Sequence, residues 1–101
     1  MALVTVARLS ELVPGKGRCV QANGKKLALF LVEGKCYAID DNCTHRSTPL
    51  SEGMCYGTEV ICPLHGARFD LATGEHRNPP AKKGVTAYAV QVDGDEVKVE
   101  V

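Results

Sequence analysis

The chain has 101 residues, of which 45% are apolar, and its 12 Lys and Arg balance its 12 Asp and Glu to a formal net charge of zero. A chain of this length buries roughly 60–68% of its unfolded surface, which allows one modest core and leaves no room for a second domain. The neutral charge argues against a nucleic-acid binder, because such proteins use basic residues to neutralise phosphates. We therefore expect a single domain over residues 1–101.

The N-terminal segment, Met1 to Arg8, has no basic stretch before its apolar residues and so does not resemble a targeting signal. The longest apolar run, Leu27 to Val32, is far shorter than the roughly 20 residues that span a bilayer. We expect a cytoplasmic protein with no membrane partner. The five cysteines are an odd number, which in that compartment favours a metal site plus spare buried thiols over a disulfide framework.

The pattern along the first 40 residues predicts short strands. Ser10 could begin a single helical turn, which Pro14-Gly15 would end at once. Three apolar runs follow with glycine-containing turns between them, at residues 18–22, 27–32 and 35–39. Because the run at 27–32 is apolar on both faces, we expect it to be a central strand that is covered on each side.

The C-terminal residues 86–101 predict a closing hairpin. Val97, Val99 and Val101 alternate with polar residues, as Tyr88, Val90 and Val92 do upstream, and Asp93-Gly94-Asp95 supplies the turn. The whole pattern is all-β. The cysteines at 19, 36 and 55 are interpreted as small buried or half-buried hydrophobic residues.

The stretch from Asp41 to Pro80 breaks this rhythm, since apolar alternation fades there and Gly, Pro, Cys and His accumulate. Irregular chain of this length inside a small domain is usually functional. It contains Cys43-Thr44-His45 and Cys62-Pro63-Leu64-His65, which are separated by 16 residues. Each cluster offers one thiolate and one imidazole, so two tight loops could supply four ligands to one metal centre. His76 has no Cys at ligand spacing and is interpreted as a solvated loop residue.

Two kinds of metal centre accept two Cys and two His. A mononuclear zinc site does, but its usual spacing pairs Cys with Cys and His with His. In a Rieske 2Fe-2S cluster, one iron has both Cys and the other has both His. Because each cluster in this chain mixes the two residue types, the spacing favours the second kind.

At these residues the sequence resembles the Rieske iron–sulfur family, whose pattern is Cys-x-His followed at a similar distance by Cys-x-x-His and Gly. The resemblance implies that Cys43 and Cys62 bind one iron, while His45 and His65 bind the other with their imidazole edges facing solvent. It also implies one 2Fe-2S cluster per chain and an antiparallel β-sandwich of short strands, with a cluster-binding subdomain of two loops at about residues 41–80.

At four positions the sequence differs from the Rieske proteins of cytochrome bc complexes, which limits the resemblance to other members of the family. Thr48 and Leu64 stand where those proteins have two further Cys that form a disulfide, and Ala67 and Phe69 stand where they have a Ser and a Tyr. The missing hydroxyls would have donated hydrogen bonds to sulfur, which stabilise the more negative, reduced cluster. We therefore expect a reduction potential near the low end of the family range.

Single-domain Rieske proteins without that disulfide resemble the ferredoxin components of bacterial ring-hydroxylating oxygenase systems. The resemblance implies a one-electron carrier that docks transiently, first to a flavin-containing NAD(P)H reductase and then to a terminal oxygenase. The chain has no dinucleotide or phosphate-binding fingerprint, so it is not expected to be an enzyme itself. Arg46, Arg68 and Arg77 are candidate charges at the docking rim. The alternatives are a Rieske small subunit of another redox enzyme, such as assimilatory nitrite reductase, and a zinc-stabilised interaction domain.

Overall fold

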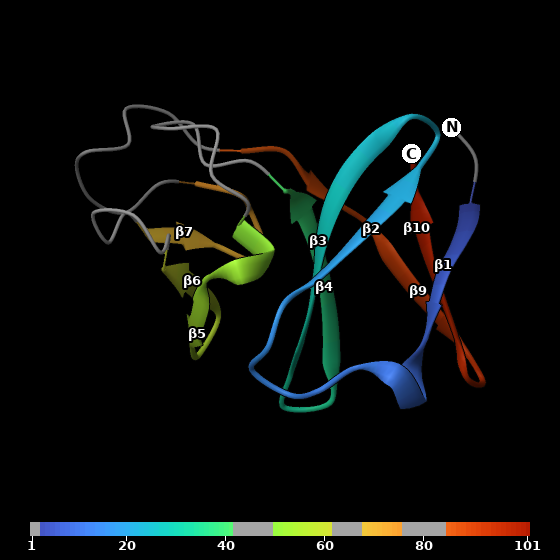
Figure 1. The fold of residues 1–101 in the computed structure, drawn as a ribbon, viewed down its shortest axis with the longest axis horizontal. Helices are drawn as coiled ribbons and strands as arrows, with labels where there is room; N and C mark the ends of the chain where they lie inside the picture. The colour runs from blue at the N-terminus through green and yellow to red at the C-terminus, as the bar shows by residue number, and fades with distance from the viewer. Residues whose placement is uncertain (1–2, 42–49, 62–67, 76–84) are drawn as a thin grey trace.

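The computed structural model describes residues 3–41, 50–61, 68–75 and 85–101. Within these ranges the chain forms ten strands, two short 3-10 helices and no α-helix (Figure 1), which confirms the all-β prediction. None of the helical segments in the described ranges is long and apolar enough to cross a membrane. The elements are β1 (Leu3–Arg8), η1 (Leu9–Glu11), β2 (Arg18–Ala22), β3 (Lys25–Val32), β4 (Lys35–Asp40), η2 (Leu50–Glu52), β5 (Met54–Tyr56), β6 (Glu59–Ile61), β7 (Arg68–Asp70), β8 (Ala87–Tyr88), β9 (Val90–Asp93) and β10 (Glu96–Glu100).

The strands form three antiparallel sheets that lie side by side (Figure 1). We call β1–β10–β9 the terminal sheet, β2–β3–β4–β8 the central sheet and β5–β6–β7 the small sheet. The central sheet lies between the other two, and its strand β3 is covered on both faces. This arrangement agrees with the expected antiparallel sandwich of short strands.

Two hydrophobic cores fill the spaces between the sheets, and β3 contributes to both. Leu27 and Leu29 pack in the core against the terminal sheet, together with Val97 and Val99 of β10. The next residues along β3, including Phe30, pack in the second core against the small sheet. Because successive side chains of a strand point to opposite faces, this division confirms that 27–32 is a strand covered on each side.

The turns that join β2, β3 and β4 are tight hairpins. Asn23 and Gly24 have φ angles of 52° and 77°, and Glu33 and Gly34 have φ angles of 51° and 80°. Two consecutive residues with positive φ are typical of two-residue hairpin loops whose twist matches that of the flanking strands. The predicted runs at 18–22, 27–32 and 35–39 are confirmed with nearly the same limits.

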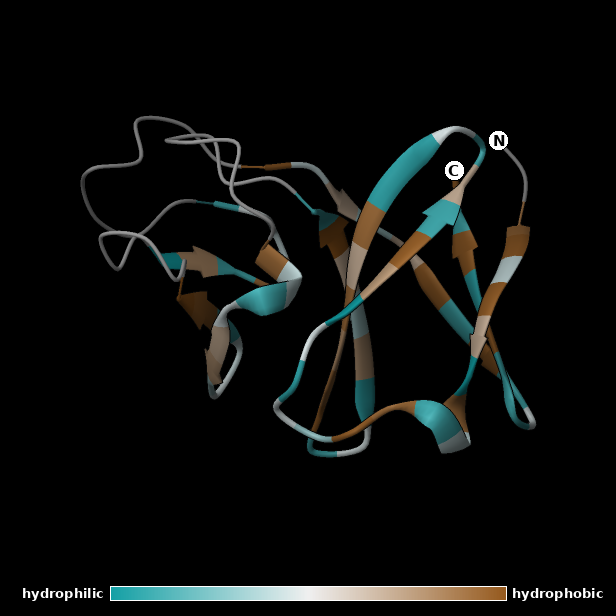
Figure 2. Cartoon of the chain, in the orientation of Figure 1, coloured by the Kyte–Doolittle hydropathy of each residue, from teal (hydrophilic) through white to brown (hydrophobic). Residues whose placement is uncertain are grey.

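The C-terminal hairpin of β9 and β10 is confirmed, and Figure 2 shows the apolar and polar residues alternating along β10. The hairpin is shorter than the predicted range of residues 86–101. Tyr88 lies in β8 and pairs with Ala38 in the central sheet, whereas Val90 lies in β9 and pairs with Val99 in the terminal sheet. The chain therefore crosses from one sheet to the other at this point.

Four strands were not expected from the sequence. Strand β1 pairs with β10 at the edge of the terminal sheet. Strands β5, β6 and β7 lie inside the stretch 41–80 that reads as irregular chain, and each has only three residues. Three residues cover barely one repeat of the strand period, so the sequence carries no recognisable alternation there.

Candidate metal centre

The four predicted ligands all lie outside the described residues. Cys43 and His45 fall in 42–49, and Cys62 and His65 fall in 62–67. The structure instead describes the residues at which these two segments begin and end. Those residues determine whether the fold brings the two segments to one place.

The first segment, 42–49, lies between Asp41 and Leu50, and a pair of hydrogen bonds joins the residues on its two sides. The backbone N–H of Ser51 donates to Oδ1 of Asp41 at 2.7 Å, and the Ser51 hydroxyl donates to Oδ2 at 2.8 Å. Asp41 is only 8% exposed, and Leu50 is fully buried in the second core. The ends of 42–49 are therefore fixed beside each other and anchored to the core.

The second segment connects β6 to β7, two neighbouring strands of the small sheet. Ile61 pairs with Arg68 across the ladder, so 62–67 begins and ends at adjacent positions. Val60 and Phe69, one residue further from the segment on each strand, are fully buried in the second core. This hairpin gives the residues 62–67 a rigid base.

The bases of the two segments touch. Gly53, which directly follows η2, lies so close to β6 that a Cβ at this position would overlap the carbonyl oxygen of Ile61. The backbone N–H of Gly53 also donates to the carbonyl of Leu50 at 2.9 Å. Only glycine permits this approach between two backbones. The described residues that flank 42–49 and those that flank 62–67 thus meet at one end of the molecule.

The ends of residues 76–84, which contain Pro79 and Pro80, lie at this end as well. The N–H of Val85 donates to the carbonyl of Gly74 at 2.7 Å. The N–H of Asp40, next to the first segment, donates to the carbonyl of Thr86 at 3.0 Å, and the N–H of Thr86 donates to Oδ2 of Asp40 at 3.2 Å. The Tyr88 hydroxyl donates to Oδ1 of Asp40 at 2.6 Å. Burial and this hydrogen bond raise the pKa of Tyr88 to about 12. At neutral pH the phenol is therefore a permanent donor that ties β8 to β4.

The donor set fits a 2Fe-2S cluster of the Rieske kind. Two thiolates and two imidazoles divide between the two irons of such a cluster, and the sequence of each of the two segments contains one Cys and one His. The described ranges hold no group of three or more His, Cys, Asp or Glu that could bind a metal. The predicted ligands therefore have no competing site in the part of the chain that the structure describes.

The three other cysteines behave differently from one another. Cys36 is buried in the first core and Cys55 is half-buried against the second, as expected for small hydrophobic residues. Burial raises the pKa of Cys55 to about 11. Cys19 is exposed, so its assignment as a buried residue is wrong. It lies on the opposite face of β2 from the buried Val20, and a hydrogen bond with Asp41 is the main cause that raises the pKa of its thiol.

Sequence reasoning missed Asp41 and Ser51 as residues of this site. Asp41 is recognisable only as the last residue before the first cluster of ligands, and Ser51 lies ten positions away. One signal was available, since the tripeptide Leu-Ser-Glu of η2 also occurs at residues 9–11 as η1. Of the other residues predicted to matter, Arg68 is exposed at the start of β7 and Phe69 is buried, while Arg46, Thr48, Leu64, Ala67, His76 and Arg77 lie outside the described residues.

Comparison with known proteins gives a family match and several relatives. The family described as Rieske [2Fe-2S] domain matches residues 2–89. The chain is 37% identical over 97 residues to the ferredoxin component of the naphthalene 1,2-dioxygenase system of Pseudomonas aeruginosa, a match that covers 96% of this chain and 93% of that protein.

Solved structures show the same relationship. The ferredoxin of carbazole 1,9a-dioxygenase from Nocardioides aromaticivorans IC177 superposes with a TM-score of 0.93 at 35% identity, over 98% of this chain and 97% of that chain. A ferredoxin seen in complex with its reduced oxygenase in carbazole 1,9a-dioxygenase superposes with a TM-score of 0.88 at 35% identity, over 96% of this chain and 91% of that chain.

The alternative of a nitrite reductase subunit has weaker support. A putative NADH-dependent nitrite reductase small subunit from Mycobacterium tuberculosis superposes with a TM-score of 0.89, but at only 22% identity over 99% of this chain and 96% of that chain. That likeness shows a shared fold and no more. The family match, the near-complete coverage of dioxygenase ferredoxins and the mixed Cys/His segments lead to one conclusion: this chain belongs to the Rieske [2Fe-2S] domain family.

Proposed function

We propose that this chain is the ferredoxin component of a ring-hydroxylating dioxygenase system, a one-electron carrier between a flavin-containing NAD(P)H reductase and a terminal oxygenase. The observation that carries the proposal is the match, over almost the full length of both chains, to the naphthalene dioxygenase ferredoxin component. Relatives of this kind are named as ferredoxin components or ferredoxin subunits of dioxygenase systems, so we propose that the chain carries electrons and is not an enzyme by itself.

Within this proposal, Cys43 and Cys62 hold one iron, and His45 and His65 hold the other. When bound, the 2Fe-2S cluster takes up and releases a single electron. The described residues support this assignment because the two segments that contain the ligands start and end at bases that touch through Gly53. One cluster per chain follows from four ligands in two segments. The cluster-binding part is proposed to span about residues 41–80 of a single domain, 1–101.

Two further parts of the proposal concern the surroundings of the carrier. The three described cysteines are all free, which supports a reducing compartment such as the cytoplasm. Docking is proposed to be weak, transient and salt-sensitive, with the partner approaching the two ligand segments. The complex of oxygenase with ferredoxin in carbazole 1,9a-dioxygenase supports a direct contact of this kind. Arg68, exposed beside the second segment, is the one candidate rim charge that the described residues include.

The ligand assignment is tested by matched Cys→Ser variants of the purified, anaerobically reconstituted protein. We expect two iron atoms and two sulfides per chain in the wild type, and the low average g value of a reduced cluster with imidazole ligands. Cys43→Ser and Cys62→Ser should lose the iron, whereas Cys19→Ser and Cys55→Ser should keep it. A colourless wild-type protein that binds zinc instead would contradict the proposal.

The carrier role is tested with a flavin reductase and an oxygenase of the dioxygenase type. We expect NADH-driven oxygenase turnover to require the wild-type protein and to fall as salt rises from low to physiological ionic strength, since screening shortens the reach of surface charges. Charge reversal at Arg68 should slow turnover and flatten this salt dependence. Nitrite-dependent oxidation of NADH through a nitrite reductase, without oxygenase turnover, would favour the alternative partner.

A further inference from the structure

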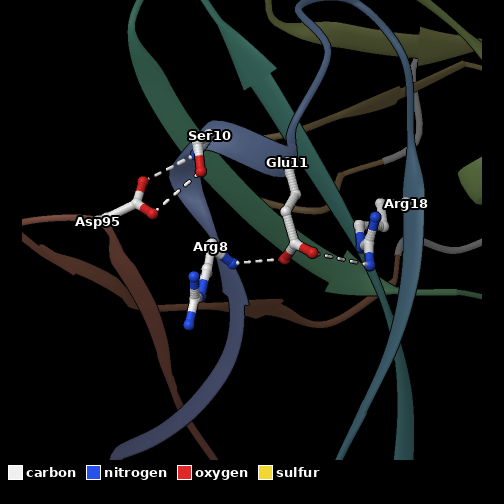
Figure 3. A network of polar contacts seen from close by, with 5 residues as sticks. All are labelled: Arg8, Ser10, Glu11, Arg18 and Asp95. Atoms are coloured by element: carbon white, nitrogen blue, oxygen red, sulfur yellow. Dashed lines mark hydrogen bonds and ion pairs between the residues drawn. The ribbon is translucent and has the colours of Figure 1, made fainter.

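The tripeptide Leu-Ser-Glu occurs twice in the chain, each time as a 3-10 helix that is held by an aspartate from elsewhere. In η1, Ser10 donates its backbone N–H to Oδ1 of Asp95 at 2.9 Å and its hydroxyl to Oδ2 at 3.0 Å (Figure 3). In η2, Ser51 donates the same two groups to the two oxygens of Asp41 at 2.7 and 2.8 Å. The two contacts are therefore chemically identical.

Their positions in the fold are different. The Ser10–Asp95 pair is exposed and fastens η1 to the turn between β9 and β10, far along the chain from the predicted ligands. The Ser51–Asp41 pair is part-buried and joins the residues that flank 42–49. The N–H of Asp41 also donates to the carbonyl of Lys26 at 3.1 Å. Asp41 is thus held from two elements, η2 and β3.

Backbone packing reinforces the second pair. A Cβ at Gly17 would overlap the carbonyl oxygen of Ser51 and lie within 2.8 Å of Cε1 of Phe30. The carbonyl group of Ser51 therefore lies close to Gly17, while its N–H and hydroxyl donate to Asp41. Such a residue has little freedom to move unless the bond to Asp41 is broken.

We propose that Asp41 and Ser51 are positioning residues for the cluster: their paired hydrogen bonds fix the chain on both sides of Cys43 and His45, so that these ligands keep hold of the iron. The inference rests on the proposed function. It assigns to the Ser51–Asp41 pair a role that the identical Ser10–Asp95 pair does not have. Breaking the Ser51–Asp41 pair should let the iron leave through local unfolding around this pair, while the rest of the fold stays intact.

The test compares Ser51→Ala with Ser10→Ala in the holo-protein, by measuring the rate at which iron passes to an added chelator. Each variant loses one hydroxyl bond to a carboxylate and keeps the backbone bond. We expect Ser51→Ala to release iron about ten-fold faster than wild type, as the loss of a hydrogen bond to a charged group implies. Ser10→Ala should release iron at a rate within about two-fold of wild type, because its bond is exposed and remote from the ligands.

A second readout separates positioning from general destabilisation. The release rates are measured again in low concentrations of urea, well below the unfolding transition. A local opening exposes little surface, so the rate for Ser51→Ala should be almost independent of urea, whereas release through global unfolding would rise steeply. If Ser51→Ala does not fold, Asp41→Asn against Asp95→Asn provides the same comparison.

Two results would overturn the inference: equal release rates for the two serine variants, or acceleration in Ser51→Ala with the full urea dependence of global unfolding. Either can occur while the wild-type protein binds its cluster, which leaves the proposed function intact. Failure of the wild-type protein to bind iron would instead refute the proposed function. The two hypotheses are therefore tested separately.

Discussion

Tyr88→Phe tests whether the hydrogen bond between β8 and β4 stabilises the frame beneath the ligand segments. The Tyr88 hydroxyl donates to Oδ1 of Asp40 at 2.6 Å. A hydrogen bond to a carboxylate contributes about 1.5 kcal/mol or slightly more, and we expect the variant to lose this amount of unfolding free energy at neutral pH. Tyr56→Phe is the matched control, since Tyr56 is 70% exposed and should change the free energy of unfolding very little.

The same contact predicts a dependence on pH. Burial and the hydrogen bond to Asp40 raise the pKa of Tyr88 from 10.0 to about 12. Since the folded pKa is the higher one, the stabilisation is fully present below pH 10 and is lost as pH rises through 12. The difference corresponds to about 2.7 kcal/mol, which we reduce to about 1–1.5 kcal/mol because the phenol is only partly buried.

Urea unfolding of wild type and Tyr88→Phe between pH 8 and about pH 11.5 measures both effects. The curves of unfolding free energy against pH should lie apart at pH 8 and converge as pH rises, because only the wild type has a Tyr88 phenol to ionise. Equal stability at pH 8, or curves that stay parallel to the highest pH, would refute this reasoning.

Three further predictions concern the second core and its surroundings. Gly53→Ala should destabilise the protein by about 1–3 kcal/mol and lower its iron content, because the added Cβ meets the β6 backbone; Gly57→Ala, which meets nothing within 4 Å, should keep full iron content, and equal iron contents would contradict this. Alkylation of Cys55, followed by peptide mass spectrometry, should be slow at pH 8 and accelerate until about pH 11, since burial raises the thiol pKa to that value; fast labelling at pH 8 would show that the thiol is not shielded. The reduction potential should lie nearer −150 than +300 mV, because Phe69 offers no hydroxyl to a sulfur; voltammetry that places it near the upper value would disprove this.

The sequence predicted those parts of the fold in which side-chain alternation is long enough to read. The runs at 18–22, 27–32 and 35–39 became β2, β3 and β4, because each has enough apolar residues on one face and ends at a turn. The strands of the small sheet were not predicted, because each has only three residues and so shows no recognisable alternation. The crossing between β8 and β9 escaped as well, since Tyr88 and Val90 continue one alternation in sequence while they pair with different sheets.

The sequence predicts which residues bind the cluster but not the contacts that hold the surrounding chain in place. The types and spacing of Cys and His predict four ligands, which lie outside the described residues, and the family match shows the Rieske [2Fe-2S] domain to which they would belong. The Asp41–Ser51 pair and the approach of Gly53 to β6 depend on contacts between elements, and the repeated tripeptide Leu-Ser-Glu does not reveal which residue Ser51 contacts. Cys19 shows the same limit, because its exposure follows from which face of the central sheet is covered at that point.

Strand β3 contributes side chains to both cores, with Leu29 in one and Phe30 in the other. Water cannot enter either core unless one apolar face of β3 loses its packing. The two ends of the molecule should therefore unfold together in a single cooperative transition. The amide protons of β3 should accordingly be among the last to exchange with heavy water, and only through complete unfolding. A carrier built in this way offers its partners a stiff, preformed surface whichever of them it meets.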